Sequence, residues 1–256
     1  MPVSELRLYV CGHIAVEAGD AAVLERAFPA RQGRRLWAYL VLHRRWPVGR
    51  TDLVEAVWGM DAPDAAESAL NALVSRLRAA LRPVTARQPD FAIRGEPGRY
   101  AVALPPGAFV DYERARTAIH AADAAVHGGD LPAALAEARV AMEIAGRGFL
   151  PGEDGAWIEG ARETLGTIRA RAHERTVEIE LARGSPERAE AEARDLLARD
   201  PLRESAYRLL MRSLAAGGNP AAVPGVLAQC RHVLATRAGL DPSPETERAA
   251  RDLSGG

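Results

Sequence analysis

The sequence predicts a mainly α-helical protein with small β-sheets, arranged in two domains. Its 256 residues suffice for two domains at roughly 100 to 200 residues each. Apolar residues recur with both strand-like and helical periods up to about Leu104, whereas nearly all of the chain beyond Asp111 has a helical period. Because Pro105-Pro106-Gly107 breaks the pattern, we expect domains of residues 1–105 and 106–256.

The first domain is predicted to begin with a small sheet. Apolar residues alternate with other residues from Leu6 to Val16, up to a plausible turn at residues 19–20. Helices are expected next at residues 32–43 and 50–58, because apolar residues have helical spacing there.

A third helix is predicted over Ala65 to Leu81, with two different faces. At 100° per residue, five apolar side chains fall within about 60° of the first of them. They are Leu70, Leu73, Val74, Leu77 and Leu81. The opposite stripe is polar and contains Ser68, Asn71, Ser75, Arg78 and Arg82. Arg76 lies on the other flank of this stripe from Arg78, so one face is expected in the core and the other is available for hydrogen bonding.

A β-hairpin is predicted after the third helix. The segments 91–93 and 100–104 alternate like paired strands. The turn-rich tip between them has an arginine at each end, Arg94 and Arg99.

The second domain is predicted to be a tetratricopeptide-like α-helical repeat domain. Gly184-Ser185-Pro186 and Gly218-Asn219-Pro220 each precede a helical pattern and lie 34 residues apart, which is the tetratricopeptide period. A similar segment starts 55 residues before Gly184, so we expect an insertion of about 21 residues, part of it within 146–155. Trp157 follows this insertion and is expected to anchor the packing of the repeat domain.

Composition argues against several kinds of site. All 33 basic residues are arginine, so a P-loop lysine and a Schiff-base lysine are both excluded. The two cysteines, Cys11 and Cys230, are far apart, and the histidines lack metal-ligand spacing. Cys11 and His13 would share one face of a strand, but no third group is evident to orient them. We therefore expect no metal, no cofactor and no enzyme activity.

The N-terminal residues do not resemble a targeting signal. Arg7 and Glu17 interrupt the stretch in which a signal peptide would be apolar, and no run of eighteen apolar residues occurs. We expect a cytoplasmic protein without a membrane partner.

Charge is distributed unevenly between the predicted domains. Residues 1–105 contain 14 Arg against 11 Asp and Glu, a net charge of +3, and residues 106–256 contain 19 against 23, a net charge of -4. The sign favours the first domain for contact with a polyanion such as DNA.

The order of strands, three helices and a hairpin resembles an OmpR/PhoB-type winged helix-turn-helix. Trp58-Gly59, the segment 73–81 and the segment 93–100 resemble the end of that family's second helix, its recognition helix and its wing. In the second domain, Pro201-Leu202-Arg203-Glu204 and residues 239–246 resemble the bacterial transcriptional activation domain. Together these segments are similar to SARP-type antibiotic regulatory activators.

The resemblance implies roles for residues of the third helix. Arg76 would read a base edge, most often that of guanine, while Arg78 and Trp58 would position the phosphate backbone. Asn71 would pair with adenine or bind phosphate.

Other residues have more open assignments. Ser68 and Ser75 would allow close approach of the DNA. Arg94 matches the wing arginine that enters the minor groove, or it is a surface arginine at a strand end. Arg99 is an apparent extra residue of the wing. Several further arginines either contact phosphate or only aid solubility: Arg34, Arg35, Arg44, Arg45 and Arg50.

The resemblance implies an activator that binds direct repeats in double-stranded DNA near a promoter. RNA polymerase is the implied protein partner, and self-association into a homo-oligomer is expected of the repeat domain. Two alternatives remain open. One is a protein-interaction adaptor with weak or lost DNA binding, and the other is a ligand-sensing regulator that binds a small molecule in its repeat domain.

Overall fold

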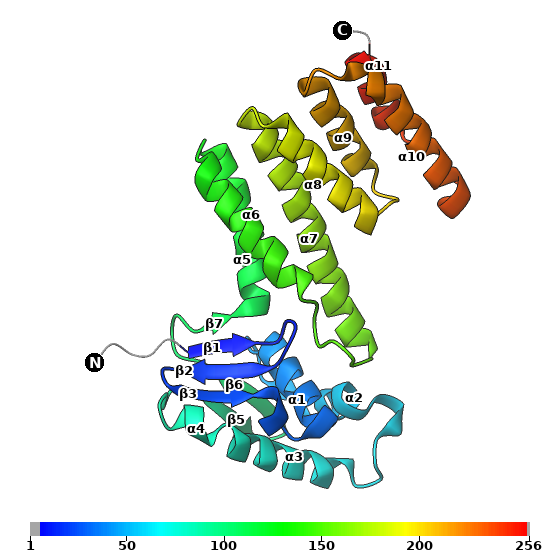
Figure 1. Ribbon diagram of the computed structural model, residues 1–256. Helices are drawn as coiled ribbons and strands as arrows, with labels where there is room; N and C mark the ends of the chain where they lie inside the picture. Colours follow the sequence, from blue (N-terminus) through cyan, green and yellow to red (C-terminus); the bar gives the residue numbers. More distant parts are fainter. Residues whose placement is uncertain (1–5, 255–256) are drawn as a thin grey trace. The chain divides into compact units, whose positions relative to one another are not determined.

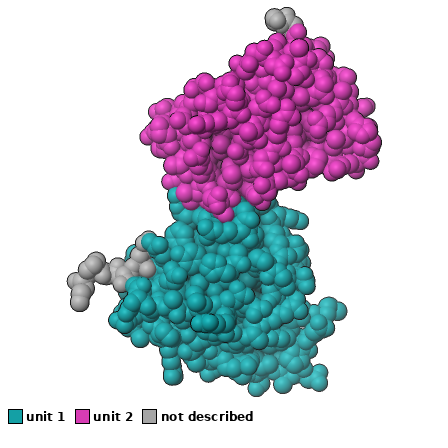
Figure 2. Space-filling view, in the orientation of Figure 1, with its two compact units in different colours: residues 1–115, 144–166 teal, residues 116–143, 167–256 magenta. Residues whose placement is uncertain are grey.

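The computed structural model describes residues 6–254, and the chain divides into two compact units. Unit 1 comprises residues 1–115 and 144–166, and unit 2 comprises residues 116–143 and 167–256 (Figure 2). The units therefore do not follow the order of the chain, because a segment from the second half of the sequence is part of unit 1.

Unit 1 begins with a small sheet, as expected. It contains β1 (Leu6–Tyr9), β2 (Ala15–Ala18), β3 (Ala21–Leu24) and β7 (Phe109–Val110), in the order β3-β2-β1-β7 (Figure 1). β1 and β3 run antiparallel to β2, and β7 runs parallel to β1.

The strand pattern expected to continue from Leu6 to Val16 is interrupted. The backbone leaves β1 after Tyr9 and turns at Gly12, which has a φ of 81°. The expectation that Cys11 and His13 share one strand face is therefore wrong, because Cys11 is buried and His13 is exposed, where it stacks on Tyr9.

The three predicted helices of unit 1 are confirmed with small shifts of their ends. After the 3₁₀ turn η1 (Glu25–Ala27), they are α1 (Ala30–Leu42), α2 (Arg50–Trp58) and α3 (Ala66–Ala80). The short elements β4 (Val48–Gly49), η2 (Gly59–Asp61) and α4 (Arg82–Thr85) flank them. α2 is followed by Gly59, whose φ of 59° ordinary side chains rarely adopt. The turn from α2 to α3 thus starts at a glycine, which adopts this φ without strain.

The hairpin has a longer first strand and a shorter tip than predicted. β5 (Ala92–Glu96) and β6 (Arg99–Ala103) are antiparallel, and β4 pairs with the other edge of β6. Pro97 and Gly98 form the two-residue turn between the strands. Proline followed by a glycine at a φ of 73° is suited to such a turn. Arg94 and Arg99 are therefore strand residues, not ends of a loop.

The segment of residues 144–166, here called the docked segment, includes the start of α7 (Ala156–Ala182) and packs within unit 1. Trp157 donates its indole N–H to the carbonyl oxygen of Ala56 on α2, 3.0 Å away, and meets the ring of Tyr39 on α1 edge to face. The prediction that Trp157 anchors the repeat domain is wrong. The residue belongs to the unit that contains α1 and α2.

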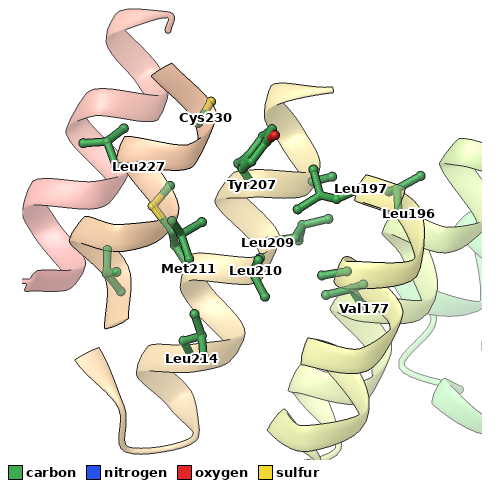
Figure 3. Packing of buried hydrophobic residues seen from close by; sticks show 14 of the residues in the cluster. Val177, Leu196, Leu197, Tyr207, Leu209, Leu210, Met211, Leu214, Leu227 and Cys230 are labelled. Carbon is green, nitrogen blue, oxygen red and sulfur yellow. The ribbon is translucent and has the colours of Figure 1, made fainter. Parts of the chain in front are cut away.

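Unit 2 is helical, as the repeat pattern predicts. It contains most of α5 (Asp111–His127), α6 (Leu131–Gly146) and α7, followed by α8 (Pro186–Arg199), α9 (Glu204–Ala216), η3 (Pro220–Ala222), α10 (Val223–Ala238) and α11 (Pro244–Ser254). α9 packs against α8, α10 and α11. Figure 3 shows the shared core, in which Tyr207 and Met211 of α9 lie among apolar side chains of the neighbouring helices. Between residues 6 and 254, no helix is both long enough and apolar enough to cross a membrane.

Candidate nucleic-acid interface

The helix α3 has the two faces that its sequence predicts. Its apolar side chains are at most 2% exposed and form the inner face: Leu70, Leu73, Val74 and Leu77. Its outer face is exposed and contains Ser68, Asn71, Ser75 and Arg76. The preceding helix, α2, ends with the half-buried Trp58.

Arg78 holds α3 against the wing. Its Nε and Nη2 donate to the carbonyl oxygen of Ile93 on β5 at 3.1 and 2.9 Å, and its guanidinium carbon lies 5.9 Å from the centre of the Tyr100 ring. The guanidinium passes beside Gly95, where a Cβ atom would lie 3.4 Å from Arg78 Nη2. Arg78 therefore braces the interface and keeps only part of its donor capacity for another ligand.

Asn71 is held from two sides by hydrogen-bond donors. Its Oδ1 accepts from Nη2 of Arg50 at 2.5 Å and from the hydroxyl of Tyr100 at 2.9 Å. Arginine can only donate, which fixes the orientation of the Asn71 amide with its oxygen inward. The amide NH₂ group of Asn71 is therefore the part left for an external acceptor.

Arg50, Asn71, Arg78 and Tyr100 form one group, here called the brace. The guanidinium carbon of Arg50 lies 5.6 Å from the centre of the Tyr100 ring, and Arg78 lies at a similar distance. The brace connects the start of α2, the middle of α3 and the wing strand β6. Hydrogen bonds and cation–π contacts thus fix α3 relative to the wing.

Further arginines project from this side without a protein partner. Within the part of the chain that the structure describes, Arg76, Arg94 and Arg99 make no hydrogen bond or ion pair through their guanidinium groups, and all three are exposed. Arg94 pairs with Ala101 in the register of β5 and β6, and Arg99 pairs with Glu96, so the two arginines share one face of the hairpin. This is the face opposite Ile93 and Tyr100, which are buried.

Other arginines considered for phosphate contact have partners in the protein. Arg34 and Arg35 pair with Glu153 at 2.8 and 3.1 Å, and Arg44 makes a two-pronged ion pair with Glu113 at 2.6 and 2.7 Å. Their charge is already neutralised inside unit 1, and their assignment to phosphate contact or to solubility stays a prediction. Of the arginines in this set, Arg45 remains exposed and Arg50 belongs to the brace.

Glu153 is the centre of a cluster that sequence reasoning missed. Its side chain is 3% exposed and accepts hydrogen bonds from Arg31, Arg34 and Arg35 at 2.7, 2.8 and 3.1 Å. Burial alone would raise the pKa of its carboxyl, but the hydrogen bonds from the three arginines outweigh burial and lower the pKa. The cluster fastens the docked segment to α1.

The docked segment changes the charge of the folded unit. Residues 1–115 and 144–166 contain 17 Arg against 17 Asp and Glu, so unit 1 has no formal net charge, unlike residues 1–105. Bulk attraction cannot then draw DNA to unit 1. Any affinity for DNA depends on where the unpaired arginines lie.

Cys11 and a cluster of one histidine with two carboxylates, all outside the interface, bear on other kinds of chemistry. Burial and the neighbouring Asp111 raise the pKa of the Cys11 thiol, so this cysteine is a poor nucleophile. Among the described residues, His173, Glu192 and Asp195 place ligand atoms within 4.8 Å of one another. They already have protein partners, since His173 Nδ1 contacts Glu192 and Asp195 pairs with Arg199 at 3.0 Å. The absence of a metal stays a prediction.

Two family models match the chain. Residues 110–253 match the bacterial transcriptional activator domain, and residues 29–94 match the C-terminal domain of transcriptional regulatory proteins. The second match contains α1, α2, α3 and the start of the wing.

Two curated relatives are AfsR regulatory proteins. The chain is 34% identical over 215 residues to AfsR of Streptomyces coelicolor, which covers 83% of this chain and 21% of that protein. It is 28% identical over 242 residues to AfsR of Streptomyces griseus, which covers 94% of this chain and 24% of that protein. The chain thus spans less than a quarter of the length of these relatives.

A solved structure has the same fold. EmbR of Mycobacterium tuberculosis, solved in complex with a low-affinity phosphopeptide, superposes with a TM-score of 0.86 at 23% identity, covering 98% of this chain and 65% of that one. At this identity the likeness bears on the fold alone.

Proposed function

The chain belongs to the SARP-type bacterial transcriptional regulators, which combine a winged-helix domain with a bacterial transcriptional activator domain, and from this premise we propose that unit 1 binds specific sequences in double-stranded DNA through α3 and the wing. The observation that carries the proposal is the position of Arg76, Arg94 and Arg99. These guanidinium groups are exposed and unpaired within residues 6–254, on the two elements that a winged helix presents to DNA.

The outer face of α3 is suited to the major groove. Arg76 can donate two hydrogen bonds to O6 and N7 of guanine. Ser68 and Ser75 are small, so the helix backbone can come close to the base edges. Because the Oδ1 of Asn71 is engaged by Arg50 and Tyr100, we assign its NH₂ group to a phosphate oxygen in preference to a two-bond contact with adenine.

The wing and the end of α2 complete the proposed interface. Arg94 is assigned to the minor groove, where a guanidinium meets a narrow negative channel. Arg99 and Trp58 are assigned to the phosphate backbone, and Arg78 to positioning of α3 on the wing, with its remaining N–H groups directed to phosphate.

The likeness to AfsR regulatory proteins supports a further part of the proposal. We assign the chain to transcriptional activation at direct repeats near promoters, with the helical domain contacting RNA polymerase and a second copy of the chain. The match of residues 110–253 to the bacterial transcriptional activator domain supports activation. Direct repeats, RNA polymerase and self-association are what the resemblance to SARP-type regulators implies.

Selection of bound fragments from genomic DNA, followed by sequencing, tests the proposal with the full chain. The expected result is an enriched sequence motif that contains guanine. On that motif Arg76→Ala should weaken binding by about 1 to 3 kcal/mol, with a smaller effect on scrambled DNA. Arg188→Ala removes an exposed arginine from α8 and should leave both affinities unchanged.

Two results would contradict the proposal. If Arg76→Ala reduces the affinity for the motif and for scrambled DNA equally, Arg76 does not read a base. If the wild-type chain enriches no motif and retains no random DNA at low salt, unit 1 does not bind DNA, and the adaptor function replaces the one proposed.

A further inference from the structure

A cavity of about 350 Å³ lies within unit 1, between α1, α2 and the docked segment. Cavities of this size hold small molecules. Its walls include two aromatic residues, Tyr39 and Trp157, and four charged residues, Arg35, Asp52, Glu55 and Asp154.

The aromatic walls form a fixed corner. The rings of Tyr39 and Trp157 meet at 85° with their centres 5.1 Å apart. The indole of Trp157 is held by its hydrogen bond to Ala56, and the ring of Tyr39 also packs against the ring of His43, whose centre lies 4.1 Å away. The corner is therefore preorganised, and a ligand that enters it need not order either ring.

The acidic wall is uncompensated. Asp52 and Glu55 lie three residues apart on α2, are both exposed, and form no ion pair with any residue from 6 to 254. Like charges at this spacing repel each other and weaken a helix slightly. They line the same cavity as Tyr39, and burial together with these two carboxylates raises the pKa of the Tyr39 hydroxyl.

The cationic wall does not offset these charges. Arg35 pairs with Glu153 at 3.1 Å, and it donates to the carbonyl oxygens of Val57 and Asp154. Asp154 in turn pairs with Arg31 at 3.3 Å. The guanidinium of Arg35 is thus engaged by other partners. Asp52 and Glu55 are left without a counter-charge.

We propose that this cavity binds a small organic cation with an apolar stem. The stem would lie in the corner of Tyr39 and Trp157, and the cationic group would lie beside Asp52 and Glu55. Aromatic faces attract cations through their quadrupole, and the carboxylates add direct electrostatic attraction. An anion would meet two like charges there, and a neutral apolar molecule would remove water from the carboxylates without replacing it.

The test uses the full chain, with agmatine as the probe and 1,5-pentanediol as a neutral control. Agmatine has a guanidinium and an ammonium group on a short aliphatic stem. Isothermal titration calorimetry should show saturable one-to-one binding of agmatine and no binding of the diol. Glu55→Gln and Tyr39→Leu should each weaken the binding about tenfold.

A matched variant separates the cavity from general electrostatic attraction. Asp90→Asn removes an exposed carboxylate that does not line the cavity, and its affinity for agmatine should equal that of the wild-type chain. Equal loss in Asp90→Asn and Glu55→Gln would overturn the proposal, and so would the absence of saturable heat up to about 10 mM agmatine. Because Glu55 is exposed, its replacement should not disturb folding, and an unchanged melting temperature verifies this. The proposal does not depend on DNA binding.

Discussion

The hydroxyl of Tyr100 on the wing donates to Oδ1 of Asn71 on α3 across 2.9 Å, and this contact joins the two elements assigned to DNA. The same oxygen accepts from Arg50 at 2.5 Å. An asparagine in the middle of an exposed helical face would ordinarily be free to rotate. Here its orientation is decided by residues from two other elements.

Tyr100→Phe removes this hydroxyl and keeps the ring between Arg50 and Arg78. We expect the free energy of unfolding to fall by about 1 kcal/mol, the net value of one hydrogen bond. Affinity for the selected DNA motif should fall as well, because the Asn71 amide is then held only by Arg50. Urea denaturation and fluorescence anisotropy measure the two effects. Tyr9→Phe is the control, and if its unfolding and binding curves match those of Tyr100→Phe, the hydroxyl contact has no role.

Glu153→Gln removes the charge that three arginines share. We expect a loss of about 3 kcal/mol at neutral pH, because breaking a buried ion pair leaves its partners uncompensated. Asp154→Asn removes the adjacent, 87% exposed carboxylate and should change stability by less than about 0.5 kcal/mol. Equal losses in the two variants would show that burial of Glu153 is not what matters.

Glu153 also predicts a dependence of stability on pH. Because the folded state lowers the pKa of Glu153 below its ordinary value of 4.5, the stabilisation is present above that value and is lost as pH falls through the lowered pKa. The melting temperature of the wild-type chain should therefore fall more steeply than that of Glu153→Gln between about pH 5 and pH 3. Parallel curves for the two proteins would rule out this contribution.

Gly33→Ala should destabilise unit 1. A Cβ atom at residue 33 would lie 2.6 Å from Cδ and 2.8 Å from Cβ of Pro29, and a proline ring cannot move aside. We expect a loss of about 1 to 3 kcal/mol, typical of overpacking. Gly160→Ala, in α7, has no neighbour within 4 Å and should gain about 0.5 to 1 kcal/mol as a helical glycine replaced by alanine. Thermal unfolding distinguishes the two signs, and a stable Gly33→Ala protein would contradict the prediction.

Arg94→Ala should change the preference of the protein for the base pairs that flank the major-groove motif. A guanidinium in the minor groove favours narrow A·T-rich segments, so the variant should lose this preference and reduce the slope of log affinity against log salt by about 1. Binding to motifs with A·T-rich and G·C-rich flanks at several salt concentrations gives both quantities. If the wild-type chain already binds both flanks equally, Arg94 is a surface arginine at a strand.

The sequence predicted what depends on local periodicity. The bounds of α3 were within one residue of those observed, and the inward position of Leu70 and Leu77 followed from helical spacing. The two-residue strands β4 and β7 were not predicted, because so short a segment has no period of its own. Their positions depend on partner strands elsewhere in the chain.

The partners of the arginines could not be predicted for a related reason. The partners of Arg34 and Arg44 lie 119 and 69 residues away along the chain. Sequence spacing gives no indication of such distant pairs. The brace is similar, because the role of Tyr100 depends on the register that brings β6 opposite Asn71. Glu153 is distinguished by its burial, and burial of a single glutamate in a glycine-rich segment is seen only in the fold.

The position of the docked segment determines how the winged helix should be isolated. A fragment that ended at the proline-rich break near residue 105 would lose Glu153, the intramolecular counterion of Arg31, Arg34 and Arg35. It would also have a formal charge of +3, in place of the neutral charge of unit 1. Such a fragment would attract any polyanion more strongly than the intact protein does, so its affinity for DNA would overstate the native attraction and understate the native selectivity.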